Sequence, residues 1–179
     1  LGKRRGFQVY DDPLVILVNK FSASASEILA GAIQDYRRGL VVGTDTFGKG
    51  TVQRVEPLDS GQIRFTESKF YRVSGGSTQN KGVSPDIYLP SPIDVEDIGE
   101  NQLLGALNYD KITTTNFRDF NLVGHSKKSL ISKHNDRIEK SLIFRNLEKK
   151  KKLRQSQKDD IWLQLHIEKR KDKKNTSEL

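Results

Sequence analysis

A short apolar run, a turn, a helical pattern and a second apolar run constrain the fold of this chain more than any other feature. Leu14 to Val18 is continuous and rich in branched residues, which is typical of a strand buried on both faces of a sheet. Apolar residues at helical spacing then predict a helix from Ser24 to Arg38, and Gly39 ends it. Residues 40–42 are the second apolar run. This order predicts a βαβ crossover with parallel strands, and therefore an α/β core.

The following part of the chain predicts antiparallel structure. A loop rich in glycine and threonine covers 43–50. Two strand-like segments, 51–58 and 62–73, are separated by Asp59-Ser60-Gly61, which is typical of a hairpin turn. Residues 86–90 form a short closing strand. The expected fold class is therefore mixed α/β (α+β), a core that contains a βαβ unit and a short β hairpin region.

The C-terminal third differs in charge and composition from the rest. The whole chain has a formal net charge of +8, and residues 125–179 hold 17 Lys+Arg against 8 Asp+Glu. Strict alternation over 161–167 predicts one late strand. We expect a core in 1–90, a weakly patterned linker in 91–124 and a basic, mainly helical extension in 125–179. An amphipathic helix in this extension is marked by Leu130, Ile131, His134, Ile138 and Leu142.

Composition excludes several classes of protein. The lysine run 149–152 is more typical of a solvated helix face than of a nucleic-acid patch, so we expect no nucleic-acid partner. The longest apolar run, 14–18, is too short to span a bilayer, and the first residues lack the pattern of a signal peptide. Without Cys there is no disulfide framework and no thiolate metal site. Met is also absent, and we therefore expect a processed product or a piece of a longer protein.

Three serines, Ser22, Ser24 and Ser26, lie in the turn between the first strand and the helix. A nucleophilic hydroxyl is favoured there, because free N–H groups at a helix N-terminus can bind the oxyanion that develops on attack. Ser24 and Glu27 also form the S-x-x-E pattern of a capping box, in which Ser24 only caps the helix. The spacing favours the cap over the nucleophile, and it does not choose among the three serines.

A second candidate is Lys49, which lies between Gly48 and Gly50. The segment nearly matches the phosphate-loop pattern G-x-x-x-x-G-K-[ST]. Gly50 stands where Ser or Thr is needed for magnesium, however, and a strand-like segment follows instead of a helix. We therefore expect no ATP binding and no cofactor. Partial burial would lower the pKa of a lysine and give a neutral amine that can accept a serine proton.

The three histidines, His125, His134 and His166, all lie in the C-terminal third. Their surroundings are lysine-rich or amphipathic and hold no acid–nucleophile pattern, so surface or packing roles are favoured over catalysis. We therefore expect that the base of a hydrolase site in this chain is not histidine, and we expect no bound metal.

Two long motifs resemble a known family. Asn19 to Asp35 (NKFSASASEILAGAIQD) and Val42 to Gln53 (VGTDTFGKGTVQ) resemble the signature of carboxy-terminal processing, or tail-specific, serine proteases, which act with a Ser–Lys pair. The similarity continues through Lys69 to Gln79 and Gly82 to Ile87, near the end of that protease core. His134 to Ile138 resembles the helical C-terminal extension of the large proteobacterial members. The resemblance thus covers most of the chain.

The resemblance implies roles for individual residues. It implies Ser24 as the nucleophile and Lys49 as the general base. Gln53 is implied as the group that orients the lysine amine, and the backbone N–H of Ala25 as one half of the oxyanion hole. Asp35 corresponds to an acidic third residue discussed for some members. It follows Ser24 by about 16 Å along a helix, so we expect a structural role for Asp35, such as anchoring a loop.

In the family, a PDZ-like domain that captures the substrate C-terminus precedes this region, as does a glycine that supplies the second oxyanion donor. The chain resembles the C-terminal half of such a protease, and the N-terminal and PDZ-like segment is an expected partner. The resemblance also implies ATP-independent cleavage of proteins or peptides with apolar C-termini, a periplasmic location and a membrane-associated adaptor as a further partner. A function of another class stays open, namely a non-catalytic scaffold or partner-binding remnant that uses the basic tail.

Overall fold

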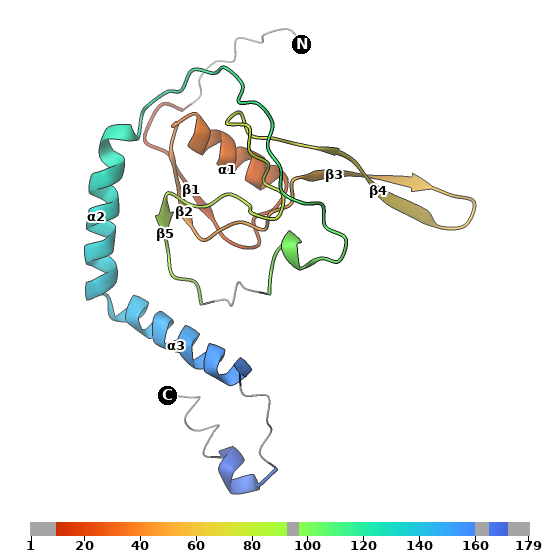
Figure 1. Cartoon of the computed structure of the whole chain (residues 1–179). Helices are drawn as coiled ribbons and strands as arrows, with labels where there is room; N and C mark the ends of the chain where they lie inside the picture. Colours follow the sequence, from red (N-terminus) through yellow and green to blue (C-terminus); the bar gives the residue numbers. More distant parts are fainter. Residues whose placement is uncertain (1–9, 93–96, 160–164, 172–179) are drawn as a thin grey trace.

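This computed structural model describes residues 10–92, 97–159 and 165–171, which contain two small sheets and a series of helices (Figure 1). One sheet has the strand order β1 (Val15–Val18), β2 (Leu40–Gly43) and β5 (Ile87–Tyr88), with parallel pairing throughout. Helix α1 (Ala25–Asp35) connects β1 to β2. The βαβ crossover and the mixed α/β fold class predicted from the sequence are therefore confirmed.

A small apolar core lies between α1 and one face of this sheet. The other face of the sheet is less covered, because Val15 and Leu17 of β1 are 53% and 74% exposed. The prediction that this strand is buried on both faces is therefore wrong. Helix α1 also ends before the predicted Arg38, because Arg37 has a φ of 49°, in the left-handed region. The core residues are Val18, Ala30, Val41 and Val83, with Ile16 packed against them.

A long hairpin of β3 (Thr51–Pro57) and β4 (Gln62–Lys69) projects away from the sheet (Figure 1). Its turn is closed by a hydrogen bond from the Leu58 N–H to the Gly61 carbonyl at 3.0 Å. The ladder is irregular near its base, where Val52 pairs with Ser68 but Gln53 pairs with Thr66. Such a bulge twists a strand and re-aims neighbouring side chains. Here it lies beside Gln53, one of the candidate site residues.

The amphipathic helix predicted in the extension is divided in two, α2 (Gly124–Lys140) and α3 (Leu142–Asp159). The break falls at Ser141, whose backbone is extended with a ψ of 121°. Helix α2 contacts the core through an ion pair between Lys127 and Asp86 and a hydrogen bond between His134 Nε2 and the Tyr88 carbonyl at 2.9 Å. His134 is buried, so it has the packing role that its position in the sequence favours.

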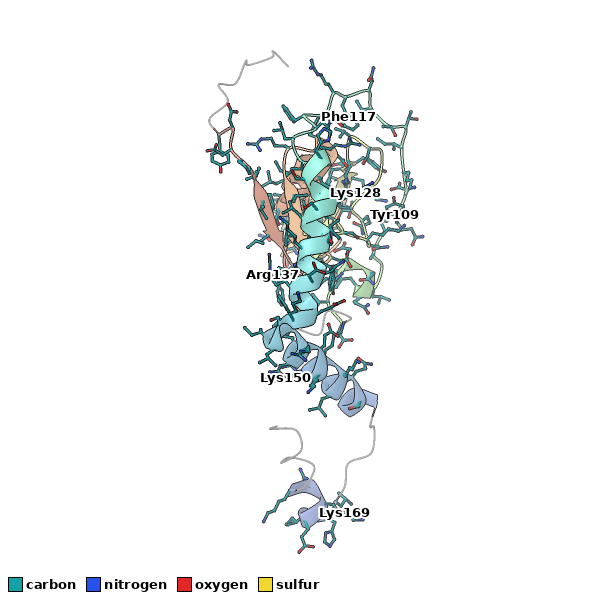
Figure 2. All side chains as sticks on the ribbon, turned by 90° about the vertical axis from the view of Figure 1, so that its left-hand side faces the viewer. Tyr109, Phe117, Lys128, Arg137, Lys150 and Lys169 are labelled. Carbon is teal, nitrogen blue, oxygen red and sulfur yellow. The ribbon has the colours of Figure 1, made fainter. Side chains whose placement is uncertain are left out.

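The basic side chains of the extension lie along its helices, as Lys128, Arg137 and Lys150 show (Figure 2). All four lysines of 149–152 are exposed. The late strand predicted for 161–167 falls mostly outside the described residues. In its described part that prediction is wrong, because 165 and 166 are in no strand and a helical turn covers 167–171.

The segment expected to be a linker makes specific contacts with the end of α1. The Phe120 N–H donates to the Tyr36 carbonyl at 2.8 Å, and the rings of Tyr36 and Phe117 meet edge to face with centroids 5.3 Å apart. Arg37 forms an ion pair with Asp119 at 3.2 Å. A short 3-10 helix, η1 (Glu100–Gln102), lies earlier in the same segment. The boundaries expected at 90 and 124 stay a prediction.

Candidate active site

The three serines of the strand-to-helix turn differ in their surroundings. The Ser22 hydroxyl accepts a hydrogen bond from the Asn19 N–H at 3.1 Å, and the Ser26 hydroxyl donates to the Ala23 carbonyl at 2.7 Å. Both side chains therefore stabilise the turn. Ser24 differs in its backbone, with φ 56° and ψ −113°. A serine rarely adopts such dihedrals, and strain of this kind is concentrated at functional sites.

Ser24 immediately precedes α1, as a nucleophile on a strand–helix elbow does. Ala25 is the first residue of that helix. Its N–H is therefore one of the four N-terminal donors that have no acceptor within the helix. These groups also carry the positive end of the helix dipole. A developing oxyanion beside Ser24 would be stabilised by this arrangement.

A buried carboxylate connects this turn to the lysine loop. Glu27 is 0% exposed, and its Oε2 atom accepts hydrogen bonds from the backbone N–H of Ser24 at 2.8 Å and of Lys49 at 2.9 Å. Its Oε1 atom accepts from the Thr46 hydroxyl at 2.5 Å and from the Gly48 N–H at 2.7 Å. Four donors compensate the cost of burying the charge. One side chain thus fixes the backbone of both candidate catalytic residues.

The glycines beside Lys49 allow another segment to pack against this loop. A Cβ atom on Gly50 would lie 2.6 Å from the Gln79 nitrogen, and one on Gly48 would lie 2.9 Å from the Asn80 carbonyl carbon. The fully buried Gln79 accepts a hydrogen bond from the Gly50 N–H at 2.8 Å, and the Asn80 N–H donates to the Gly48 carbonyl at 2.8 Å. The backbone of Lys49 is therefore held by Glu27 on one side and by this segment on the other.

The candidate residues meet in an open cleft of about 460 Å³ at the N-terminus of α1. Ser24, Ala25, Lys49 and Gln53 all line it, and they come from the turn, the helix, the loop and β3. The Lys49 Nζ atom lies 3.5 Å from Gln53 Oε1, at the long limit of a hydrogen bond. The remaining walls are formed by Ile28, Thr51, Val52, Val55, Arg64 and Phe70.

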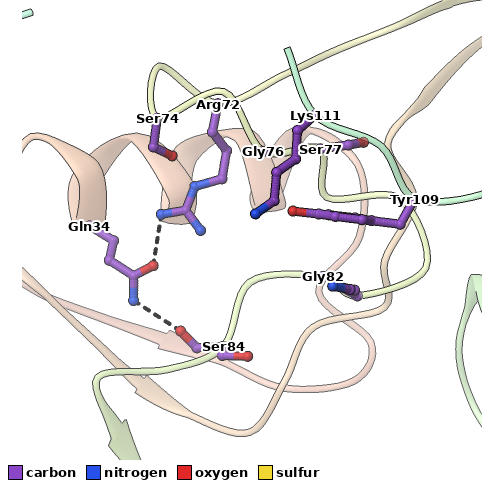
Figure 3. Close-up of a pocket in the computed structure, with 10 residues that line it drawn as sticks. Gln34, Arg72, Ser74, Gly76, Ser77, Gly82, Ser84, Tyr109 and Lys111 are labelled. Atoms are coloured by element: carbon purple, nitrogen blue, oxygen red, sulfur yellow. Dashed lines mark hydrogen bonds between the residues drawn. The ribbon is translucent and has the colours of Figure 1, made fainter. Parts of the chain in front are cut away.

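Asp35 lies at the other end of α1 and does not line this cleft. It forms an ion pair with Arg72 and accepts a hydrogen bond from the Ser74 hydroxyl at 3.0 Å. Arg72 also donates to Gln34, whose amide donates to the Ser84 carbonyl (Figure 3). Asp35 therefore anchors the segment that follows β4.

The same close-up shows the hollow beside this anchor, into which Lys111 and Tyr109 point (Figure 3). It is separate from the cleft of Ser24, because the two hollows have no lining residue in common. The structure therefore brings four of the five candidates together and places Asp35 elsewhere.

Sequence reasoning missed the roles of Glu27 and Gln79. Glu27 occupies the third helical position of a capping-box pattern, which accounts for its presence without any contact to Lys49. Its contacts with 46–49 join residues about 20 positions apart, and spacing does not reveal them. The sequence offered one signal for a buried role of Glu27. It is a charged residue that directly precedes the apolar Ile28 and Leu29, in a helix that is expected to bury one face. In the described residues, no group of acidic or histidine side chains could hold a metal ion, and no helix has the length and hydropathy of a membrane span.

Comparisons with known proteins match both parts of the chain. Residues 2–89 match the model of peptidase family S41, and residues 93–179 match that of the C-terminal domain of tail-specific protease. The chain is 41% identical over 176 residues to the tail-specific protease of Haemophilus influenzae, covering 92% of this chain and 25% of that protein. It is 45% identical over 105 residues to the carboxy-terminal-processing protease of Bartonella bacilliformis, covering 54% of this chain and 24% of that protein.

A solved structure of a photosystem II D1 C-terminal processing protease is 47% identical, covers 43% of this chain and 20% of that one, and superposes with a TM-score of 0.41. The chain spans 25% and 24% of the lengths of the two curated relatives above. The two family models follow one another along the chain, 2–89 and then 93–179. The chain belongs to the tail-specific, carboxy-terminal processing proteases of peptidase family S41.

Proposed function

We propose that this chain carries the nucleophile and the base of an ATP-independent serine endopeptidase that works with a Ser–Lys pair. The main support is the cleft that Ser24, Ala25, Lys49 and Gln53 line together, with the strained backbone of Ser24 at its edge. The proposal also holds that these residues are the C-terminal portion of a longer protease. It is supported by the coverage of the Haemophilus influenzae relative, of which this chain matches only 25%.

In the proposed reaction, the Ser24 hydroxyl attacks the carbonyl carbon of the scissile peptide bond while neutral Lys49 takes its proton. The oxyanion of the tetrahedral intermediate accepts a hydrogen bond from the Ala25 N–H. Lys49 then gives the proton to the leaving amine as the C–N bond breaks, which produces an acyl-enzyme. Water, deprotonated by Lys49, then attacks the ester carbonyl. As the bond to the serine oxygen breaks, Lys49 returns the proton to Ser24 and the acid is released.

Gln53 is proposed to orient the amine of Lys49 by accepting a hydrogen bond from it. Support comes from the distance of 3.5 Å between Lys49 Nζ and Gln53 Oε1 and from the bulge in the ladder beside Gln53. The second oxyanion donor is assigned to a glycine in the preceding part of the protein, by resemblance to the family.

The substrates of the whole protein are proposed to be proteins or peptides with apolar C-termini, captured by a preceding PDZ-like segment. We further propose a periplasmic location and a membrane-associated adaptor as a partner. All three proposals rest on the resemblance to the tail-specific proteases.

The proposed chemistry is tested in the full-length protein with a peptide that has an apolar C-terminus. Ser24→Ala and Lys49→Ala should each abolish turnover, and a fluorophosphonate probe should label wild-type protein at Ser24. Ser26→Ala is the matched control, since among the described residues that hydroxyl bonds only to the Ala23 carbonyl within the turn. Wild-type turnover in both Ser24→Ala and Lys49→Ala would refute the assignment.

A second candidate is a non-catalytic scaffold that binds an acidic partner through its basic tail. The exposed lysines of 149–152 on α3 favour it. This alternative would be supported by two results together. The probe does not label the intact chain, and the chain binds an acidic protein with an affinity that depends strongly on salt. Nucleic-acid binding would also weaken steeply with added salt.

A further inference from the structure

The short helix η1 brings a buried carboxylate to the loop that carries Lys49. Glu100, the first residue of η1, is 7% exposed. Its backbone N–H donates to the Phe47 carbonyl at 3.0 Å, and its Oε1 atom accepts a hydrogen bond from Gln79 Nε2 at 3.3 Å. The preceding Gly99 allows this approach, since a Cβ atom there would lie 3.2 Å from the Phe47 carbonyl oxygen. Glu100 therefore contacts the lysine loop directly as well as through Gln79.

The Gln79 side chain connects this carboxylate to the residue that follows Lys49. Gln79 is fully buried, and its Oε1 atom accepts a hydrogen bond from the Gly50 N–H at 2.8 Å while its Nε2 atom donates to Glu100. If the amide were turned over, its NH2 group would face the Gly50 donor and its oxygen would face the carboxylate. Both hydrogen bonds would then be lost. Glu100 therefore selects the amide orientation in which Gln79 holds Gly50.

The backbone around Lys49 is anchored on both sides. On one side, Glu27 accepts hydrogen bonds from the Gly48 N–H at 2.7 Å and from the Lys49 N–H at 2.9 Å. On the other side, the Gly50 N–H is bonded to Gln79. A glycine released from such a bond has wide backbone freedom, which would let the neighbouring lysine move. A displacement of about 1 Å can cost about 100-fold in rate, so the second anchor matters as well as the first.

Glu100 belongs to a different part of the chain from the residues that it supports. Lys49 and Gln79 lie within residues 2–89, which match peptidase family S41, whereas Glu100 lies within 93–179, which match the C-terminal domain of tail-specific protease. Figure 1 shows η1 near the start of β3, the strand that follows the lysine loop. The C-terminal domain thus supplies a contact to the loop of the candidate base.

We propose that Glu100 is a positioning residue for the reaction, which acts through Gln79 to hold the backbone of Lys49 beside Ser24. The inference rests on the proposed function, because it takes Lys49 as the base. Glu100 does not line the cleft of Ser24, so its contribution is the orientation of a buried amide and not a contact with the substrate. The C-terminal domain is then required for the full rate of the chemical step.

The first test is Glu100→Met in the full-length protein, which removes the acceptor and keeps the length of the side chain. With a peptide that has an apolar C-terminus, kcat should fall by about 10-fold or more while KM stays within about 2-fold, because Lys49 acts in the transition state. Leu104→Ala is the control, since Leu104 is fully exposed in the same segment. It should keep both constants. Wild-type kcat in Glu100→Met, or a change in KM alone, would overturn the proposal.

Glu100→Gln tests whether the hydrogen bond or the charge matters. The carbonyl oxygen of the new amide can still accept from Gln79 Nε2, so kcat should stay within about 3-fold of wild type. A fall as large as that in Glu100→Met would contradict the proposed role. If Glu100→Met does not fold, Glu100→Asp takes its place, because its carboxylate is drawn back from Gln79 by one methylene group.

A double variant shows whether Glu100 acts through Gln79. Gln79→Met removes the acceptor of the Gly50 N–H and should lower kcat by about 10-fold or more on its own. Adding Glu100→Met should then lower kcat by less than about 2-fold further, because the connection is already broken. Independent effects, in which the two fold-changes multiply, would show that Glu100 does not act through Gln79 and would refute the inference.

Hydrogen exchange resolved to single amides gives a measurement that does not depend on turnover. In Glu100→Met, exchange at the Gly50 N–H should be at least about 10-fold faster than in wild type. The Gly48 N–H, which is bonded to Glu27, should keep its wild-type rate. A general loss of stability would accelerate exchange at both amides equally, and that result would count against a positioning role.

Probe labelling separates this inference from the proposed function. If the fluorophosphonate probe labels Ser24 and the peptide is cleaved but Glu100→Met keeps wild-type kcat, only the positioning role fails. If wild-type protein shows neither labelling nor cleavage, the proposed function fails and the positioning role falls with it.

Discussion

Glu27 holds the backbone of Lys49, because its Oε2 atom accepts a hydrogen bond from the Lys49 N–H at 2.9 Å. The same atom accepts from the Ser24 N–H at 2.8 Å. The candidate nucleophile and base lie 25 positions apart in the sequence but are fixed by one oxygen atom. Because this carboxylate is fully buried, water cannot replace it when it is removed.

Glu27→Gln should reduce both stability and turnover. The amide places an NH2 group against backbone donors, so at least one hydrogen bond to a charged acceptor becomes a contact between two donors. We expect a loss of about 2–3 kcal/mol in the free energy of unfolding and a fall of about 100-fold in kcat/KM from misplacement of the reacting groups. Denaturant titration and peptide hydrolysis measure the two effects.

Glu67→Gln is the control for this prediction, because the Glu67 side chain lies on the hairpin and is 49% exposed. It should change stability by less than about 1 kcal/mol. Wild-type turnover in Glu27→Gln would show that the carboxylate does not position the site.

Ser24→Gly should be at least as stable as Ser24→Ala, although both lack the hydroxyl. Glycine in an ordered segment normally costs up to about 1 kcal/mol relative to alanine. At φ 56° and ψ −113° the Cβ atom of alanine keeps the backbone strain, which is worth about 1–3 kcal/mol, and glycine removes it. Thermal unfolding of the two variants under the same conditions makes the comparison. A clearly lower midpoint for Ser24→Gly would argue that the turn is unstrained.

Asp35→Asn should destabilise the protein without changing the chemistry. It leaves Arg72 partly buried without its carboxylate, and breaking such a pair costs about 3–5 kcal/mol when fully buried. We expect a loss toward the lower end of that range. Below the unfolding temperature, the pH profile of kcat/KM should keep its wild-type shape. The probe should label Ser24 at the wild-type rate.

An Asp35→Ala, Arg72→Ala double variant tests the reason for this loss. Its destabilisation should be smaller than the sum of the two single changes, because the charge left unpaired in each single variant is removed. A shifted pH profile in Asp35→Asn would instead indicate that Asp35 takes part in the reaction.

The contact between Asp110 and Lys69 should weaken in acid. The hydrogen bond from Lys69, followed by that from Tyr71, holds the pKa of Asp110 below its usual value of 3.8. Because the folded pKa is lower than the unfolded one, the contact stabilises the fold above about pH 4. That contribution is lost as the pH falls through the folded pKa.

Hydrogen exchange of residues near 110, compared between wild type and Asp110→Asn, measures this effect. The two proteins should differ at pH 7 and converge toward pH 2. Equal protection at pH 7 would show that the ion pair, with N and O atoms 2.9 Å apart, contributes nothing.

Much of the fold follows from local patterns in the sequence. The branched run at 14–18, the helical spacing after it and the run at 40–42 predict β1, α1 and β2, because periodicity determines which face an element can bury. The hairpin follows from alternation and the turn at Asp59-Ser60-Gly61. The exposure of Val15 and Leu17 could not be predicted, since it depends on what packs against the second face of the sheet.

The break of the long helix at Ser141 was not predicted either. Apolar spacing continues through it, from Ile138 to Leu142, so the pattern favours one helix. The late strand was a wrong assignment in its described part, because alternation over few residues competes with helix formation in a lysine-rich segment.

The sequence by itself determined the family, the order of the elements and the candidate residues, because the serine and lysine motifs are contiguous and unusual. Tertiary structure decided how those residues are arranged. It tied the hydroxyl groups of Ser22 and Ser26 into separate hydrogen bonds within the turn. It also placed Ser24 at strained backbone dihedrals and Lys49 beside Gln53 in the same cleft.

Tertiary structure also paired Asp35 with Arg72 and gave Glu27 its four hydrogen-bond donors. The physical reason is the range of the contacts. Local spacing specifies the direction of a side chain within its own element, whereas a buried carboxylate shared by a turn and a distant loop exists only after the chain has folded.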